Sequence, residues 1–236
     1  GALISGNCNI AIGQLALSGA TNQQVDNNIA IGTSAMVGSA STTGDDNIAI
    51  GTTAMDALTT GACNIALGKN ALGAATIGLK NIAIGEAAMS GVTTAQADGN
   101  IAIGLNALTG AAGTSGNCNV AVGKDALKAL TTAHDSIGIG RFAADALTTG
   151  GCNIAIGKDS FGAATIGVKN IAIGCGSMSG VTTGQADSNI AIGEYALTGA
   201  AGTTGNDNIA IGRLTADALT TGACNIAMGI NAYGTA

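Results

Sequence analysis

Proline and tryptophan are absent from this chain of 236 residues, and only four residues are aromatic. The lack of proline favours a fold in which nearly every backbone N–H donates to a neighbouring strand, because proline has no N–H to donate. Charged residues make up only 9% of the chain and apolar residues 47%. This balance excludes a disordered chain, even though the sequence contains 39 glycines.

Basic residues are also scarce: the net charge is −6, and lysine and arginine form no cluster. We therefore expect no nucleic-acid partner, because contact with phosphates needs a basic surface. No apolar run approaches the roughly 18 residues that a membrane-spanning helix needs. Membrane insertion is not expected either.

A five-residue phrase, Asn-Ile-Ala-Ile-Gly, recurs thirteen times with small variations, and every step between neighbouring copies is 17 or 19 residues. In the first copy, residues 10–12 (Ile-Ala-Ile) alternate large and small apolar side chains with the period of two that a β-strand has. Because β-branched residues suit a buried pleated surface, we expect the isoleucines to point into the core. The alanine then lies on the opposite face, where only a small side chain fits.

A small residue and then a large apolar one follow each phrase, as in Ala16-Leu17 and Ala54-Met55. We interpret the pair as a second short strand or corner whose large residue enters the same core. One coil alone is unstable, since ordering each backbone residue costs about 1–2 kcal/mol and burying a large apolar side chain contributes roughly 1.5–3 kcal/mol. Stability must come from the stacking of successive coils, as in a solenoid.

The sequence therefore predicts an all-β fold, a parallel β-solenoid (β-helix or β-roll) of about 13 coils of 17 or 19 residues. Residues 1–236 are expected to form a single repeat domain, uncapped at both ends. Two interpretations of these ends stay open: the chain is an excerpt of a longer solenoid, or copies stack end to end. Asparagine begins all but one copy of the phrase, and we expect its amides to form a structural ladder along the stack: Asn9, Asn28, Asn47, Asn64, Asn81, Asn100, Asn119, Asn153, Asn170, Asn189, Asn208 and Asn225.

Between Asn9 and Tyr233, the phrase and its small–large pair resemble the head domains of trimeric autotransporter adhesins. They are equally similar to the repeat regions of some phage tail fibres. The resemblance implies a parallel β-roll or β-helix, often with three chains side by side, displayed on a cell or virion surface and used in attachment. Coils of 17 and 19 residues are longer than the usual coil of an adhesin head.

Five of the six cysteines directly precede the phrase. With strands about 4.8 Å apart, the nearest two of these are roughly 9.6 Å apart, too far for a disulfide, whose Cα atoms lie within about 7 Å. We interpret them as small, half-buried residues at one corner of the coil, with contacts or disulfides between chains as the alternative. No Cys-x-x-Cys pair is present to support a zinc site. The five are Cys8, Cys63, Cys118, Cys152 and Cys224.

The only histidine, His134, lies beside Asp135 in a threonine-rich turn, with no third partner or pocket suggested for catalysis. Aspartates one or two places before the phrase are interpreted as turn-forming residues. We therefore expect no enzymatic activity, no cofactor and no catalytic or metal-binding residue. Paired threonines in expected turns are candidates for O-linked glycans: Thr42, Thr43, Thr93, Thr94, Thr182 and Thr183.

The position after the phrase glycine varies most and carries charges of both signs, so we expect a stripe that faces solvent. It comprises Gln14, Thr33, Lys69, Glu86, Lys124, Arg141, Lys158, Glu194 and Arg213.

The expected function is structural and non-enzymatic: a solenoid that builds an extracellular or virion-surface filament or fibre by coil stacking. Its expected partners are other copies of itself, stacked end to end or as a lateral trimer, together with surface glycans or a host receptor. The alternative is a trimeric receptor-binding segment, either an adhesin head or part of a phage tail fibre.

Overall fold

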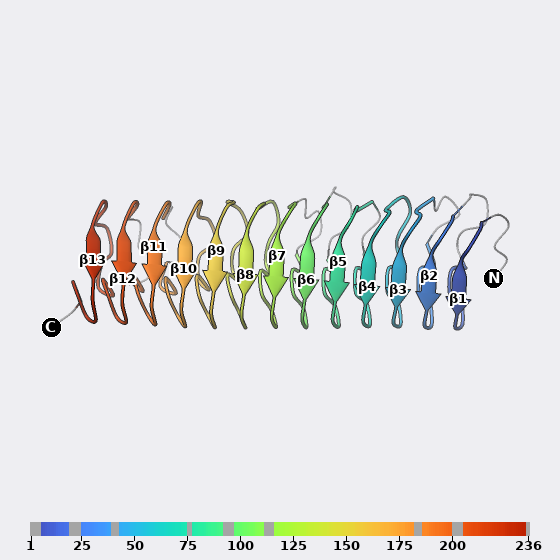
Figure 1. Ribbon diagram of the computed structural model, residues 1–236, viewed down its shortest axis with the longest axis horizontal. Coiled ribbons are helices and arrows are strands. Elements are labelled where there is room, and N and C mark those ends of the chain that lie inside the picture. Colours follow the sequence, from blue (N-terminus) through green and yellow to red (C-terminus); the bar gives the residue numbers. More distant parts are fainter. Residues whose placement is uncertain are drawn as a thin grey trace. The chain divides into compact units, whose positions relative to one another are not determined.

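The computed structural model describes residues 6–18, 25–38, 43–74, 77–91, 97–110, 116–181, 186–199 and 205–234. Its contacts divide the chain into two compact units, Gly1–Cys118 (unit 1) and Asn119–Ala236 (unit 2). Each unit is a stack of coils with one short strand per coil (Figure 1). In the described residues the secondary structure consists of strands and turns without a helix, which confirms the predicted all-β solenoid. The prediction of a single repeat domain stays a prediction.

The six strands of unit 1 follow one another in chain order, and each pairs in parallel with the next. Equivalent phrase residues lie side by side, so that Ile48 is opposite Ile65 and Ala49 opposite Ala66. Coils of 17 and 19 residues therefore differ in their turns and not in the register of the strands. The strands are β1 (Ile10–Ile12), β2 (Ile29–Ile31), β3 (Ile48–Ile50), β4 (Ile65–Leu67), β5 (Ile82–Ile84) and β6 (Ile101–Ile103).

Unit 2 repeats this arrangement with seven strands, again parallel and in register. One additional bridge joins Thr149 to Ile166 outside the named strands. The strands are β7 (Val120–Val122), β8 (Ile137–Ile139), β9 (Ile154–Ile156), β10 (Ile171–Ile173), β11 (Ile190–Ile192), β12 (Ile209–Ile211) and β13 (Ile226–Met228).

The strand alanines, and not the isoleucines, point into the core. Ala49 and Ala155 have no exposed surface, whereas the large residues on either side of each are partly exposed. The prediction that the isoleucines enter the core is therefore wrong. The reason is lack of space: a Cβ atom at Gly138, which takes the place of the strand alanine in β8, would lie 2.9 Å from Cγ of Leu127, the large residue of the preceding small–large pair.

The large residues of these pairs form the centre of the core, as predicted. Met55, Leu72 and Phe161 are at most 1% exposed. Their backbone forms a turn rather than a strand, and each has a left-handed φ, such as +51° at Met55. This conformation costs a residue with a Cβ roughly 1–2 kcal/mol. It turns the side chain inward while the N–H of Met55 donates to the Ala71 carbonyl of the next coil at 3.0 Å.

The phrase glycine has a conformation that other residues avoid. At Gly51, φ is +140°, and a Cβ atom would lie 2.4 Å from the carbonyl oxygen of Gly68 in the next coil. Both the backbone conformation and the close approach require the absence of a side chain. The glycine therefore allows the coils to stack at the spacing of the strands.

The phrase asparagines connect neighbouring coils within each unit. The Oδ1 of Asn47 accepts a hydrogen bond from the backbone N–H of Asn64 at 2.9 Å, and its Nδ2 donates to the carbonyl of Gly61 at 3.0 Å. Amide-to-amide bonds add to these contacts, as from Asn64 to Asn47 at 3.1 Å. Ser136 interrupts the pattern: the N–H of Asn153 donates to its Oγ at a longer 3.3 Å.

Candidate functional site

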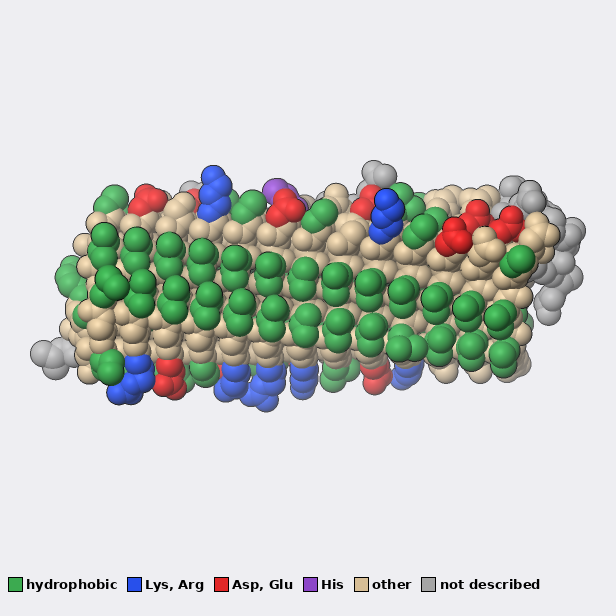
Figure 2. Space-filling view, viewed as in Figure 1, with side chains coloured by type: hydrophobic (Ala, Val, Ile, Leu, Met, Phe, Trp, Pro, Cys, Tyr) green, Lys and Arg blue, Asp and Glu red, His purple; other side chains and the backbone are tan. Residues whose placement is uncertain are grey.

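The outward-facing residues of the strands form an apolar face on each unit, here called the isoleucine face. Figure 2 shows two rows of hydrophobic side chains running across the strands. Equivalent row members lie opposite one another in neighbouring strands of each unit, and most of them are partly exposed. The members exposed by more than a third are Ile10, Ile12, Leu67, Ile103, Ile139, Ile192, Ile226 and Met228.

The isoleucine face is continuous rather than scattered. In unit 2 alone, seven strands about 4.8 Å apart extend both rows over about 29 Å. Single exposed apolar residues are ordinary on a protein surface, whereas a contiguous apolar patch makes this face a candidate interaction site. Charged side chains lie along the edges of the face (Figure 2).

One edge of each isoleucine face contains the variable position after the phrase glycine. All nine residues named for the expected solvent-facing stripe are exposed. Some pair with one another, as Lys69 does with Glu86 at 3.4 Å, but both side chains are well exposed. Such surface pairs contribute little to stability.

The corner before the phrase is more exposed than we expected. Cys8, Cys63, Cys118, Cys152 and Cys224 are exposed rather than half-buried, and all six cysteines, including Cys175, are free thiols. The residue directly before the phrase has a left-handed φ, such as +59° at Cys63. At this corner the cysteine side chains are exposed, whereas a similar φ at Met55 accompanies a buried side chain.

Aspartates two places before the phrase join neighbouring coils. The Oδ1 of Asp98 accepts a hydrogen bond from the backbone N–H of Leu79 at 2.8 Å. Asp187 makes the same contact with Val168, also at 2.8 Å. These residues therefore do more than form a local turn, since each caps a backbone N–H of the preceding coil.

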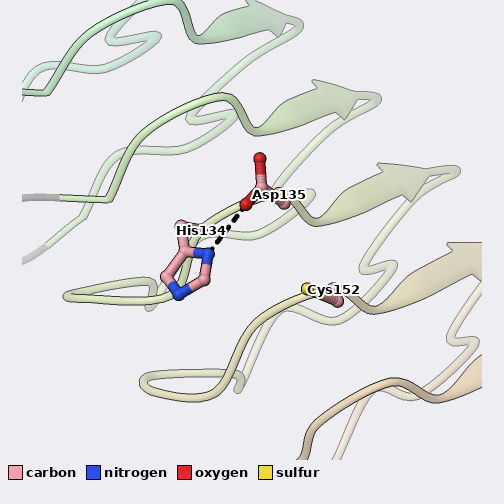
Figure 3. Close-up of side chains that lie close together, drawn as sticks. All are labelled: His134, Asp135 and Cys152. Atoms are coloured by element: carbon pink, nitrogen blue, oxygen red, sulfur yellow. Dashed lines mark hydrogen bonds and ion pairs between the residues drawn. The ribbon is translucent and has the colours of Figure 1, made fainter.

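His134 occupies this same position, two places before its phrase, but its ring is turned to the next residue. Its Nδ1 lies 2.9 Å from the Oδ2 of Asp135. The thiol of Cys152 lies beside this pair, one coil further on (Figure 3). One potential ligand atom of each residue lies within 4.8 Å of the other two, and all three residues are exposed. Among the described residues this is the one group of three histidine, cysteine or acidic side chains so close together.

A shallow hollow of about 270 Å³ lies in unit 2 beside Phe142. The Arg141 guanidinium lies 5.0 Å from the centre of the ring, and Lys124 Nζ lies 6.0 Å from it. Asp145 and Asp159 also line the hollow. Partial burial raises the pKa of the Asp145 carboxyl, and repulsion from the carboxylates of Asp159 and Asp125 raises it a little further. A backbone hydrogen bond to Asp145 acts in the opposite direction and lowers the pKa.

Five of the six glycan candidates, Thr42, Thr93, Thr94, Thr182 and Thr183, lie outside the described residues. Thr43 is exposed, and its backbone N–H donates to the carbonyl of Thr59. O-glycosylation of these residues stays a prediction.

No helix in the described part of the chain has the length and apolarity needed to cross a bilayer. No protein-family model matches the chain, and a search of curated proteins finds no match.

Proposed function

We propose that this chain is a structural, non-enzymatic segment of a fibre in which copies associate side by side through their isoleucine faces. The observation that carries the proposal is the pair of apolar rows on the strands. Removing apolar surface from water contributes about 25 cal/mol per Å². Because the isoleucine face repeats with every coil, each coil in an interface between two chains would bury apolar surface and stabilise the association.

A second copy of the chain fits this face better than an unrelated globular partner. The rows repeat at the strand spacing of about 4.8 Å, and a parallel copy has the same period. The isoleucines of the second copy can therefore contact the isoleucines of the first copy in every coil. A partner surface without this repeat could contact the rows in only a few coils. Symmetric self-association of this kind is the common form of oligomer among soluble proteins.

Side-by-side packing, often of three chains, is also what the resemblance to adhesin heads and phage tail fibres implies. In the fibre that we propose, the isoleucine faces of these chains are turned toward one another. Coil stacking then supplies the length of the fibre, and lateral contacts supply its thickness. We place the fibre outside a cell or on a virion surface on the basis of this resemblance.

Sedimentation velocity over a range of concentrations tests the proposal. In the test variant, four half-exposed row members become threonine, which keeps the β-branched shape: Ile82, Ile84, Ile171 and Ile173. We expect the original chain to form an oligomer and the variant to dissociate at least tenfold more readily. Circular dichroism establishes that the strands are retained.

A matched control changes four exposed residues on the edge stripe to glutamine: Lys69, Glu86, Lys158 and Glu194. These changes leave the net charge unaltered and are expected to leave association unaltered. An original chain that is monomeric throughout, or equal weakening by both variants, would overturn the proposal.

The hollow beside Phe142 favours a second candidate, a segment that binds a receptor saccharide. An aromatic ring flanked by cations and carboxylates offers an apolar surface and several hydrogen-bonding groups to a sugar. Glycan-array binding that is abolished by Phe142→Asn supports it. Asparagine occupies the equivalent left-handed position at Asn106, so this variant is expected to fold. Absence of saccharide binding by the original chain rejects this candidate.

A further inference from the structure

We propose that His134, Asp135 and Cys152 form a binding site for a divalent transition-metal ion of the zinc class. The site joins two consecutive coils of unit 2. It is separate from the isoleucine face, and its occupation adds a local clamp to the solenoid.

The register of the coils holds the three residues together. His134 and Asp135 directly precede the phrase that contains β8, and Cys152 directly precedes the phrase that contains β9. The backbone N–H of Cys152 donates to the carbonyl of His134 at 2.9 Å. The position of Cys152 is therefore fixed by the same kind of backbone hydrogen bond that joins neighbouring coils.

The backbone also directs the side chains and leaves room for them. Asp135 has a φ of +54° and Cys152 a φ of +61°, and both side chains point away from the coil. A Cβ atom at Gly151 would lie 2.8 Å from the carbonyl oxygen of His134, and 3.1 Å and 3.2 Å from the Cε1 and Nδ1 of its ring. Glycine at this position therefore leaves space for the imidazole, next to the thiol of the following residue.

The donor set selects the class of metal. An imidazole nitrogen, a carboxylate oxygen and a thiolate sulfur suit zinc, which binds these ligands at about 2.0–2.3 Å. Calcium and magnesium prefer oxygen ligands alone. Because the potential ligand atoms already lie within 4.8 Å of one another, rotation about side-chain bonds brings them around one ion. Binding releases the thiol proton to solvent, and water completes the fourth position of an open site.

Two other places in the chain repeat this arrangement without the histidine. Asp46 is followed one coil later by Cys63, and Asp207 by Cys224, with the same backbone contact between coils. The residue before the aspartate is Asp45 in one case and Asn206 in the other. The chain thus contains internal controls, which separate a specific three-ligand site from binding to any exposed thiol.

The test is a titration of the reduced full chain with Co²⁺, which reports thiolate coordination by a charge-transfer absorption band, followed by displacement with Zn²⁺. We expect one tight equivalent per chain, with the band arising from Cys152. Each ligand variant uses a residue that the solenoid already carries at the equivalent position: His134→Asn as at Asn206, Asp135→Asn as at Asn27, and Cys152→Ser as at Ser188.

Loss of an outer-shell partner typically weakens metal binding by roughly 10–100-fold. Loss of any one of the three ligands is expected to weaken Zn²⁺ binding by at least as much. Cys63→Ser and Cys224→Ser remove a thiol from the matched places and are expected to leave both the band and the affinity unchanged. If these controls weaken binding as much as Cys152→Ser does, or if His134→Asn binds Zn²⁺ as tightly as the original chain, the proposal is overturned.

Discussion

The Oδ1 of Asn64 accepts a hydrogen bond of 2.9 Å from the backbone N–H of Asn81, one coil further along. Both residues are at most 1% exposed. This side chain therefore satisfies a buried backbone donor of its neighbour that the strand ladder leaves without a partner. The relation recurs through each unit and makes the stability of one coil depend on the next.

Asn64→Ala is expected to be strongly destabilising. It removes the acceptor of the Asn81 N–H and the donor to the Gly78 carbonyl, which accepts from Asn64 Nδ2 at 2.7 Å. An unsatisfied buried group costs about 1–3 kcal/mol, so urea unfolding should show a loss of at least about 2 kcal/mol. The exposed Asn7→Ala is the control, with a change of no more than about 0.5 kcal/mol. Equal effects of the two substitutions would contradict the ladder's role.

Ser136→Asn is expected to stabilise unit 2. The serine hydroxyl is shorter than an asparagine amide, and the Asn153 N–H reaches it only at 3.3 Å. An asparagine here restores the shorter bond and adds a donor toward the carbonyl of Gly150, by analogy with Asn153 and Gly167. A gain of about 1 kcal/mol per net hydrogen bond is expected in the free energy of unfolding. An unchanged or lower value would show that the break in the ladder carries no penalty.

Gly51→Ala tests the requirement for glycine in the phrase. The added Cβ would lie 2.4 Å from the Gly68 carbonyl oxygen at a φ of +140°. The backbone strain alone costs about 1–3 kcal/mol, and the displaced coil adds to it, so thermal unfolding should occur at a clearly lower temperature. Gly99→Asn is the control, because its φ of +67° suits asparagine and a Cβ there would make only ordinary contact with Cys118. It should leave the unfolding temperature nearly unchanged.

Asp145→Asn is expected to stabilise the chain at neutral pH and not at acidic pH. Burial raises the pKa of Asp145 in the folded chain, so the ionised carboxyl opposes folding. This penalty is absent below the ordinary aspartate pKa of about 3.9 and complete above the raised folded value. Unfolding measured across this window should show the advantage of the variant appearing as the pH rises. The exposed Glu194→Gln is the control, and an advantage that does not change with pH would contradict the assignment.

The solenoid could be predicted from the sequence because its period is explicit. Equivalent residues such as Ile48 and Ile65 are opposite each other in the structure, as the 17-residue step requires. The inward direction of Met55 followed from the small–large pair. These conclusions depend on repetition, and they do not depend on the detailed shape of the coil.

The orientation of the strand could not be predicted from β-propensity alone, since that preference says nothing about which face is buried. Ala49 and Met55 are both fully buried, whereas Ile48 is partly exposed, so the alanine shares the interior with the large residue of the small–large pair. The nearly constant alanine was the available signal.

The cluster of His134, Asp135 and Cys152 could have been found from the sequence. Asp135 and Cys152 are separated by one 17-residue step, and applying that step to exposed side chains would have brought them together with His134.

In the proposed fibre, the isoleucine face is the interface between copies of this chain. Cryo-electron microscopy of the assembled protein shows whether it is. We predict a bundle of parallel chains in which the rows containing Ile82, Ile84, Ile171 and Ile173 lie between chains and exclude solvent. An assembly with these rows facing solvent, or single chains at every concentration, would contradict the proposed interface.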